Sequence, residues 1–236
     1  WSNNFYNTIN LNTKILKMIL EHSLKYNSRI LYCSSAAVYE TSNKKKLSNE
    51  KSKLTFGNYL NENFYSISKI LGEKLCKYYK YKYKLPIYIV RPAHTYGPGQ
   101  DFRYDYRVLP QLVKRALIEK KVYIYDKGKS IRSWTYISDV TIMLLNIIQH
   151  GKHLIYNVCG NEYKSIYQIA KTISTSQNLK KVEIKKKKLN FTNPNHDKLI
   201  LSSKRYNNEF PKLKYINFKK GVKRFIEWNK KISKTD

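Results

Sequence analysis

The chain carries the run Arg29-Ile-Leu-Tyr-Cys-Ser-Ser-Ala-Ala-Val-Tyr39 and, further on, the run Tyr65-Ser-Ile-Ser-Lys69. The first run opens with a short apolar stretch, which predicts a buried strand over residues 29–33 that ends at Ser34 and Ser35. The second run opens a segment over residues 64–81 whose apolar side chains recur at helical spacing, so Tyr65 and Lys69 share one helix face. A second strand is predicted over residues 86–90, and parallel pairing would bring the serines to the same sheet edge as the loop after this strand.

A serine, a tyrosine and a lysine in this arrangement are suited to hydride-transfer chemistry. A tyrosine hydroxyl titrates near pH ~10, and an ammonium group one helical turn away favours its phenolate form. Such a pair can remove the proton of a sugar alcohol while hydride leaves the same carbon. We therefore predict Ser35, Tyr65 and Lys69 as catalytic residues, with Ser35 holding the substrate oxygen.

The spacing Tyr-x-x-x-Lys does not identify the tyrosine by itself, because the chain has 22 tyrosines and repeats the spacing elsewhere. Only Tyr65 follows a strand that ends in serines. We expect the other copies to be ordinary surface pairs, and they begin at Tyr78, Tyr123, Tyr125, Tyr167 and Tyr215.

Three further blocks follow in order: Val90-Arg-Pro-Ala-His-Thr-Tyr-Gly-Pro98, Arg132-Ser-Trp-Thr-Tyr-Ile-Ser-Asp139 and Tyr156-Asn-Val-Cys-Gly160. Together with the first two runs, they make the chain resemble the extended short-chain dehydrogenase/reductase family of NAD-dependent nucleotide-sugar epimerases, dehydratases, decarboxylases and reductases. The resemblance implies an α/β fold, a Rossmann-like doubly wound parallel sheet with a smaller C-terminal α/β region. It assigns residues 1–100 and 139–160 to the NAD-binding domain and residues 101–138 and 161–236 to the nucleotide-sugar-binding region.

The resemblance also implies two sets of binding residues. The cofactor, NAD with NADP left open, would contact Ser34, Tyr65, Lys69, Pro92 and Ala93. The substrate, a UDP- or dTDP-linked nucleotide-sugar, would contact His94, Arg107 and Arg132, and the guanidinium fork of Arg132 suits a diphosphate. The alternative for Arg107 and Arg132 is a surface ion pair with Asp105 or Asp139.

The two residues after Ser35 bear on the reaction. In 4,6-dehydratases of this family these positions hold an aspartate and a glutamate that expel water, and nucleotide-sugar decarboxylases keep the glutamate. This chain has Ala36 and Ala37, whose methyl groups cannot transfer protons. We therefore expect a C4 epimerase or a ketosugar reductase. One alternative is a decarboxylase or dehydratase with its acid on another loop, Glu40 being the nearest candidate. Two others are a non-catalytic binding protein and a basic nucleic-acid-binding protein that reused the fold.

The family's glycine-rich turn for the NAD pyrophosphate does not occur among the eight glycines of this sequence. The sequence also begins with Trp1, and its first helical segment resembles the helix that precedes the serine strand in the family. From this layout we expect roughly 80–100 upstream residues with the first strands and the adenine half of the cofactor site. Residues 1–236 alone would then bind NAD weakly or not at all.

The composition, with 46 Lys and Arg against 16 Asp and Glu, gives a formal charge of +30. The lysines lie in short runs separated by Asn, Tyr and Ile, and no nucleic-acid-binding motif is recognisable, so we expect solvated surfaces and no specific nucleic-acid partner. The three cysteines are odd in number and widely spaced, which favours free thiols in the cytoplasm and no metal site. No run of 18 apolar residues occurs, so we expect no membrane span.

Periodicity predicts the remaining elements. We expect strands over residues 122–125 and 154–158, and helices near residues 11–25, 106–120, 139–149, 165–174, 202–210 and 218–230. The apolar stripes of the helices over residues 11–25 and 64–81 exceed what one sheet face covers. Because family members commonly pair such helices in a four-helix bundle, we expect a homodimer.

Overall fold

The computed structural model describes residues 5–39, 47–54, 64–125, 127–179, 181–185 and 198–233. Trp1 and Glu40, which the sequence analysis singled out, lie outside these residues. The chain divides into two compact units. Unit 1 consists of residues 1–93, 141–159 and 201–212, and unit 2 consists of residues 94–140, 160–200 and 213–236.

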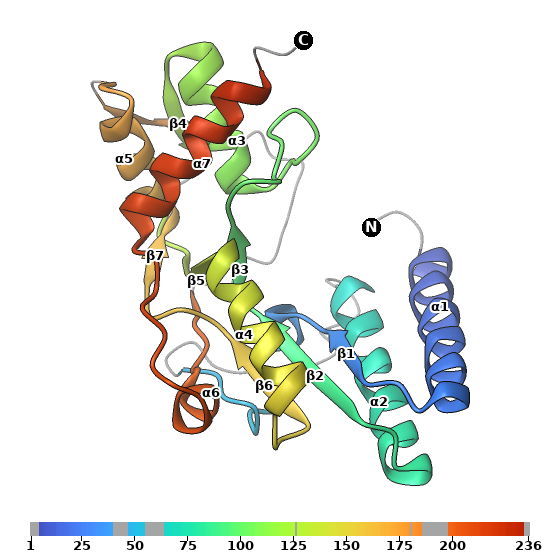
Figure 1. Cartoon of the computed structure of the whole chain (residues 1–236). Coiled ribbons are helices and arrows are strands. Elements are labelled where there is room, and N and C mark those ends of the chain that lie inside the picture. Colours follow the sequence, from blue (N-terminus) through green and yellow to red (C-terminus); the bar gives the residue numbers. More distant parts are fainter. Residues whose placement is uncertain are drawn as a thin grey trace. The chain divides into compact units, whose positions relative to one another are not determined.

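Unit 1 contains a parallel sheet with the strand order β1-β2-β6 (Figure 1). Its elements are α1 (Phe5–Tyr26), β1 (Ile30–Cys33), α2 (Phe64–Tyr83), β2 (Ile87–Pro92), most of α4 (Ile137–His150), β6 (Ile155–Val158) and α6 (Lys204–Glu209). Cys33 pairs with Val90, and Pro92 pairs with Val158. The predicted α/β fold with a parallel sheet is confirmed.

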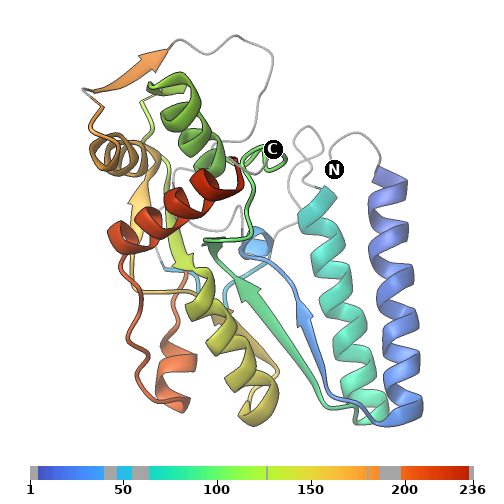
Figure 2. The same cartoon turned by 45° about the horizontal axis from the view of Figure 1, so that its top comes forward.

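Helices α1 and α2 lie side by side (Figure 2), and their buried side chains cover strands β1 and β2. Leu16 and Leu20 of α1 pack with Cys76 of α2 and Ile87 of β2. Helix α1 ends at Tyr26, and the next residue, Asn27, has a left-handed φ of 48°, a conformation that asparagine tolerates better than most residues. The chain then turns into β1, so the end of α1 sets where the serine strand begins.

Unit 2 contains a sheet with the order β3-β5-β7, with β9 also paired to β5, and a separate parallel pair, β4-β8. Its elements are β3 (His94–Tyr96), α3 (Val108–Lys114), β4 (Val122–Tyr125), β5 (Ile131–Tyr136), β7 (Tyr163–Ser165), α5 (Ile166–Ser176), β8 (Val182–Lys185), β9 (Lys198–Leu199) and α7 (Phe218–Ile232). The core joins Tyr96 and Trp134 of the sheet to Leu112, Ile169 and Phe225 of the three helices.

The structure adjusts the ends of one predicted helix and contains short strands that were not predicted, β5 among them. The helix predicted over residues 106–120 begins only at Val108 and continues as a π-helix over Arg115–Glu119. Pro110 explains the late start, because proline lacks the N–H of a helix interior and is tolerated only in the first turn. Strand β5 was not predicted, although its residues had been singled out as a motif. The six-residue sequence of β5 mixes polar and aromatic residues, and its pairing with β3, β7 and β9 makes it a strand.

Candidate functional site

The carboxyl ends of β1, β2 and β6 meet at one edge of the sheet in unit 1. The Ser34 N–H donates to the carbonyl of Val90 at 2.8 Å, and the Ala93 N–H donates to the carbonyl of Val158 at 2.9 Å. Of the predicted residues, Pro92 therefore ends strand β2 at this edge, and Ser34, Ser35 and Ala93 directly follow the ends of β1 and β2. In parallel α/β sheets this is the edge at which ligands bind.

The serines differ in their surroundings. Ser34 is 4% exposed, and its Oγ donates to Oε1 of Glu73 at 2.6 Å. Ser35 is half-buried, and its Oγ accepts the N–H of Ala37 at 3.2 Å at the start of a short 3-10 helix over Ala36–Tyr39. The hydroxyl of Ser34 is thus engaged inside the unit, whereas Ser35 is partly open to solvent.

Helix α2 brings Lys69 against the end of the serine strand. Lys69 Nζ donates to the carbonyl of Cys33 at 2.9 Å, and it lies 5.4 Å from the ring of Tyr32 and 5.6 Å from the ring of Tyr65. Burial lowers the pKa of Lys69, and the nearby Cys33 acts in the opposite direction. The ammonium group therefore lies beside both Tyr65 and the residue that precedes the two serines.

Helix α2 contains a second Tyr-x-x-x-Lys pair, Tyr78 and Lys82, for comparison with the pair beside the serine strand. Lys82 Nζ donates to Tyr78 Oη at 2.7 Å, and this hydrogen bond lowers the pKa of Tyr78. Tyr78 is 49% exposed, and its partners Lys82, Tyr79 and Tyr83 all lie on α2 itself. The Tyr78–Lys82 bond therefore joins two residues of one helix, whereas Lys69 contacts the carbonyl of Cys33 on the serine strand.

A buried polar network lies directly behind the serines, and sequence reasoning did not identify its members. Arg91 donates from Nε to Oε1 of Glu73 at 2.7 Å and from Nη2 to Oε2 at 2.6 Å, and both side chains are at most 2% exposed. Arg91 Nη1 also donates to Tyr39 Oη at 2.6 Å. Tyr39 Oη in turn donates to Oδ1 of Asn157 at 2.8 Å.

Burial raises the pKa of Tyr39 to about 12, although the charge of Arg91 opposes the shift. The sequence did contain a signal for this network. Glu73 lies one further turn along the helix face that carries Tyr65 and Lys69, and Arg91 stands in the block Val90-Arg-Pro. Glu73 lies on the buried face of α2, and Arg91 lies near the end of the buried strand β2. Once these two elements are known to be neighbours, an ion pair between the two side chains is expected, because a buried charge needs a partner of opposite charge.

The predicted substrate residues all belong to unit 2. His94 in β3 pairs in register with Trp134 in β5, and their ring centroids are 5.0 Å apart. Burial lowers the pKa of His94 to about 4, and the positive charges of Arg132 and Arg107 act in the same direction. Near neutral pH the His94 imidazole is therefore uncharged and can donate or accept a hydrogen bond.

The two arginines differ. Arg107, whose side chain is 67% exposed, forms an ion pair with Asp105, so the alternative of a surface ion pair describes Arg107 in this structure. Arg132 Nη1 donates to the carbonyl of Ile131 at 2.9 Å. Asp139, the other partner considered from the sequence, is 3% exposed and accepts the N–H of Ile216 at 2.9 Å.

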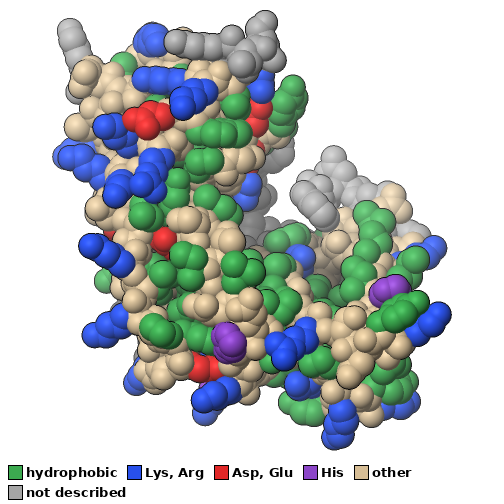
Figure 3. All heavy atoms as spheres, viewed as in Figure 1, with side chains coloured by type: hydrophobic (Ala, Val, Ile, Leu, Met, Phe, Trp, Pro, Cys, Tyr) green, Lys and Arg blue, Asp and Glu red, His purple; other side chains and the backbone are tan. Residues whose placement is uncertain are grey.

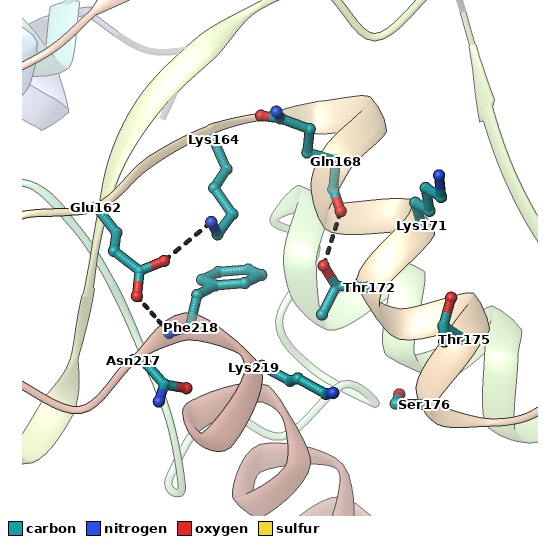
Figure 4. Close-up of a pocket in the computed structure, with 10 residues that line it drawn as sticks. All are labelled: Glu162, Lys164, Gln168, Lys171, Thr172, Thr175, Ser176, Asn217, Phe218 and Lys219. Carbon is teal, nitrogen blue, oxygen red and sulfur yellow. Dashed lines mark hydrogen bonds and ion pairs between the residues drawn. The ribbon is translucent and has the colours of Figure 1, made fainter.

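Unit 2 also contains an open hollow of about 790 Å³ between α5 and the start of α7 (Figure 4), lined by Glu162, Lys164, Gln168, Lys171, Thr172, Thr175, Ser176, Asn217, Phe218 and Lys219. Thr172 Oγ1 donates to the carbonyl of Gln168 at 2.9 Å within α5. Glu162 forms an ion pair with Lys164 at 2.9 Å and accepts the N–H of Phe218 at 2.9 Å. Thr172 thus bonds within its own helix, and the Glu162 carboxylate is engaged by Lys164 and by the N–H of Phe218, so these polar groups already satisfy one another.

Other site classes find little support in the part of the chain that the structure describes. Among these residues, no group of three or more His, Cys, Asp or Glu side chains could hold a metal ion. Cys33, Cys76 and Cys159 are free thiols. None of the described helices is both long and apolar enough to cross a membrane.

Comparison with known proteins links these features to a family. Residues 2–159 match the model of the NAD dependent epimerase/dehydratase family. Over 110 residues the chain is 31% identical to a dTDP-4-dehydro-6-deoxy-D-allose reductase of a Streptomyces species, covering 46% of this chain and 34% of that protein. Over 179 residues it is 31% identical to an uncharacterized UDP-glucose epimerase of Bacillus subtilis, covering 73% and 52%.

Solved structures agree in fold. The chain superimposes on dTDP-glucose 4,6-dehydratase from Bacillus anthracis, determined in complex with NAD, with a TM-score of 0.79 and 23% sequence identity, covering 93% of this chain and 67% of that one. The chain spans about a third to a half of the curated relatives described above, with 34% and 52% of their lengths.

Proposed function

Because this chain belongs to the NAD dependent epimerase/dehydratase family, we propose that it forms the catalytic part of an NAD-dependent nucleotide-sugar enzyme that works at C4 of the sugar. The observation that carries the proposal is the hydrogen bond from Lys69 Nζ to the carbonyl of Cys33 at 2.9 Å. It holds the Tyr65–Lys69 turn of α2 against the residue that precedes Ser34 and Ser35. None of the other described Tyr-x-x-x-Lys pairs has a contact of this kind.

In this proposal Ser35 Oγ orients the C4 oxygen by a hydrogen bond, and Tyr65 Oη accepts the C4 hydroxyl proton as the C4–H bond breaks. Bound NAD would supply a reversible hydride acceptor at this edge of the sheet. Tyr65 then gives the proton back to the C4 oxygen, so the carbon is oxidised and reduced again with no net loss of atoms. Lys69 keeps a positive charge beside Tyr65 in both steps.

The residues at the sheet edge of unit 1 fit a dinucleotide cofactor. The half-buried ammonium group of Lys69 and the backbone after β2 at Pro92 and Ala93 lie where α/β folds bind nucleotides. We therefore assign the cofactor to Ser34, Tyr65, Lys69, Pro92 and Ala93, with NAD or NADP as the species. The engagement of Ser34 Oγ with Glu73 leaves the backbone of Ser34 as its contact.

We assign the nucleotide-sugar, UDP- or dTDP-linked, to His94, Arg107 and Arg132 of unit 2. An uncharged His94, packed against the buried Trp134, offers a neutral group that can donate or accept a hydrogen bond to a sugar hydroxyl. Arg132 offers a guanidinium fork for the diphosphate. Arg107 would have to exchange Asp105 for the substrate, so we expect the smaller contribution from it.

Ala36 and Ala37 decide the reaction class in this proposal. Elimination of water from C5 and C6 needs an acid and a base within about 3 Å of the reacting atoms, and these two residues supply neither. We propose a C4 epimerase or a ketosugar reductase. NMR of the products of the full-length enzyme tests this, since a C4 epimer or a reduced 4-keto sugar is expected. A 6-deoxy-4-keto sugar, or a pentose formed from a hexuronate, would contradict it and favour a dehydratase or decarboxylase.

We further propose that the enzyme acts as a homodimer in the cytoplasm, where its free thiols would stay reduced. Helix α1 presents an apolar stripe to solvent that consists of Leu11, Ile15, Met18 and Ile19, which are 48–61% exposed. Hydrophobic side chains are visible over this helix in Figure 3. A second copy of the same helix would cover the stripe with a self-complementary apolar face.

A further inference from the structure

Side chains of helix α2 form hydrogen bonds to Cys33 and Ser34, the two residues that precede Ser35. Lys69 binds the carbonyl of Cys33, and one turn later Oε1 of Glu73 accepts the Ser34 hydroxyl at 2.6 Å. Glu73 is 1% exposed, and an isolated carboxylate at such a depth would be costly. The bidentate bond from Arg91 compensates its charge and leaves Oε1 available as a second acceptor for Ser34.

The same helix also forms a hydrogen bond to Ala37, two residues after Ser35. Ser66, which directly follows Tyr65, is 4% exposed, and its Oγ donates to the carbonyl of Ala37 at 2.9 Å. The N–H of Ala37 donates to Ser35 Oγ at 3.2 Å. The Ala37 N–H and the Ala37 carbonyl belong to successive planar peptide units that share the Cα atom of Ala37, so holding the carbonyl limits how far the turn that carries Ser35 can move.

We propose that Ser66 and Glu73 are positioning residues that set Ser35 relative to Tyr65, an inference that rests on the hydride-transfer function proposed above. One helix carries the proton acceptor and also holds the loop that carries the orienting serine. The separation of Ser35 from Tyr65 is therefore determined by side chains of α2 itself. An error of about 1 Å in such a separation can cost about 100-fold in rate.

If Ser66 and Glu73 only stabilised the fold, they would not need their hydrogen bonds to the loop that carries Ser34 and Ser35. Arg91 neutralises the charge of Glu73 without any contact to Ser34. The buried hydroxyl of Ser68 on the same helix is an example of a hydroxyl that has only a structural role. Ser68 is 0% exposed; its Oγ donates to the carbonyl of Tyr65 at 2.8 Å within the helix and accepts Nδ2 of Asn12 in α1 at 3.1 Å, so it holds two helices together and makes no contact with the serine loop. Ser66 instead directs its hydroxyl across to the loop, two residues beyond Ser35.

The test uses the full-length enzyme with its cofactor and a nucleotide-sugar. Ser66→Ala should lower kcat about 10-fold with little change in KM or in NAD affinity, and Ser66→Thr, which keeps a hydroxyl, should restore most of the rate. Ser68→Ala is the matched control, because it removes an equally buried hydroxyl from the same helix. It should leave kcat within about 2-fold of the wild type.

A double-mutant cycle with Ser35→Ala isolates the positioning role. If Ser66 acts through Ser35, the variant with both substitutions should be no slower than Ser35→Ala alone. Ser34→Ala removes only the hydroxyl that Glu73 holds, leaves the Arg91 pair intact, and should behave in the same way. Multiplicative losses in these cycles, or an equal loss in Ser68→Ala, would overturn the inference.

The two proposals fail in different ways. A wild-type rate in Ser35→Ala would refute the function assigned to Ser35, and the positioning role with it. A large loss in Ser35→Ala combined with a wild-type rate in Ser66→Ala would refute the positioning role alone.

Discussion

Asn157→Ala should destabilise unit 1 far more than its size suggests. Asn157 in β6 is 0% exposed, and its side chain makes three hydrogen bonds. Nδ2 donates to the carbonyls of Ser48 at 3.0 Å and Ser202 at 3.1 Å, and Oδ1 accepts from Tyr39 Oη at 2.8 Å. These bonds connect the sheet to three segments that are far apart in the sequence.

The magnitude follows from the bonds that are lost. At about 1 kcal/mol for a neutral hydrogen bond, three bonds amount to about 3 kcal/mol, and a buried Tyr39 hydroxyl without its acceptor adds roughly 1–2 kcal/mol. The matched control is Asn146→Ala in α4, since Asn146 makes one side-chain bond, from Nδ2 to Tyr206 Oη at 2.7 Å. We expect it to cost about 1 kcal/mol.

Denaturant unfolding of the full-length protein measures the two free energies. Hydrogen exchange of the Ser202 amide, which donates to the Ser48 carbonyl at 2.9 Å, reports the local opening of the same region. Exchange of this amide should accelerate strongly in Asn157→Ala and little in Asn146→Ala. If the two variants differ by less than about 1 kcal/mol, the side-chain bonds of Asn157 do not hold these segments on the sheet, and the reasoning is refuted.

Three further predictions concern the site and the assembly. Tyr65→Phe removes the proton acceptor and should lower turnover by about 10²–10⁴-fold with little change in KM, whereas Tyr78→Phe should have a near-normal turnover. Steady-state kinetics with the reverse result would show that Tyr65 is not the catalytic tyrosine. The pKa of His94, measured by NMR, should be about 4. Because an unfolded histidine binds its proton near pH 6.5, the folded state should lose stability as the pH falls from 6.5 toward 4, and the non-titrating variant His94→Asn should lose less. Met18→Asp, at a side chain 61% exposed on α1, should convert a dimer to a monomer in sedimentation, while Ile118→Asp, at a side chain 60% exposed in unit 2, should not; a wild-type protein that sediments as a monomer would contradict the proposed interface.

Local patterns in the sequence predicted a large part of the fold correctly. Short apolar runs and helical periodicity depend on neighbours in the chain, so β1, α2, β2 and β6 were predicted within a few residues of their ends. Strand β5 and the late start of α3 escaped prediction. The first depends on pairing with strands from three other segments, and the second depends on Pro110, whose effect on the helix start was not taken into account.

The sequence by itself determined the order of strand, serines and helix, the α/β class and the residue types of the candidate site, because these features follow from residues close together in the chain. Only the tertiary structure distinguished the Tyr-x-x-x-Lys pair that contacts the serine strand from the pair that bonds on the surface. It alone brought residues 201–212 to unit 1 and joined Glu73 to Arg91 and Asn157 to Tyr39. Buried polar groups must find partners, and which partner is within reach depends on how distant segments pack, which no local pattern encodes.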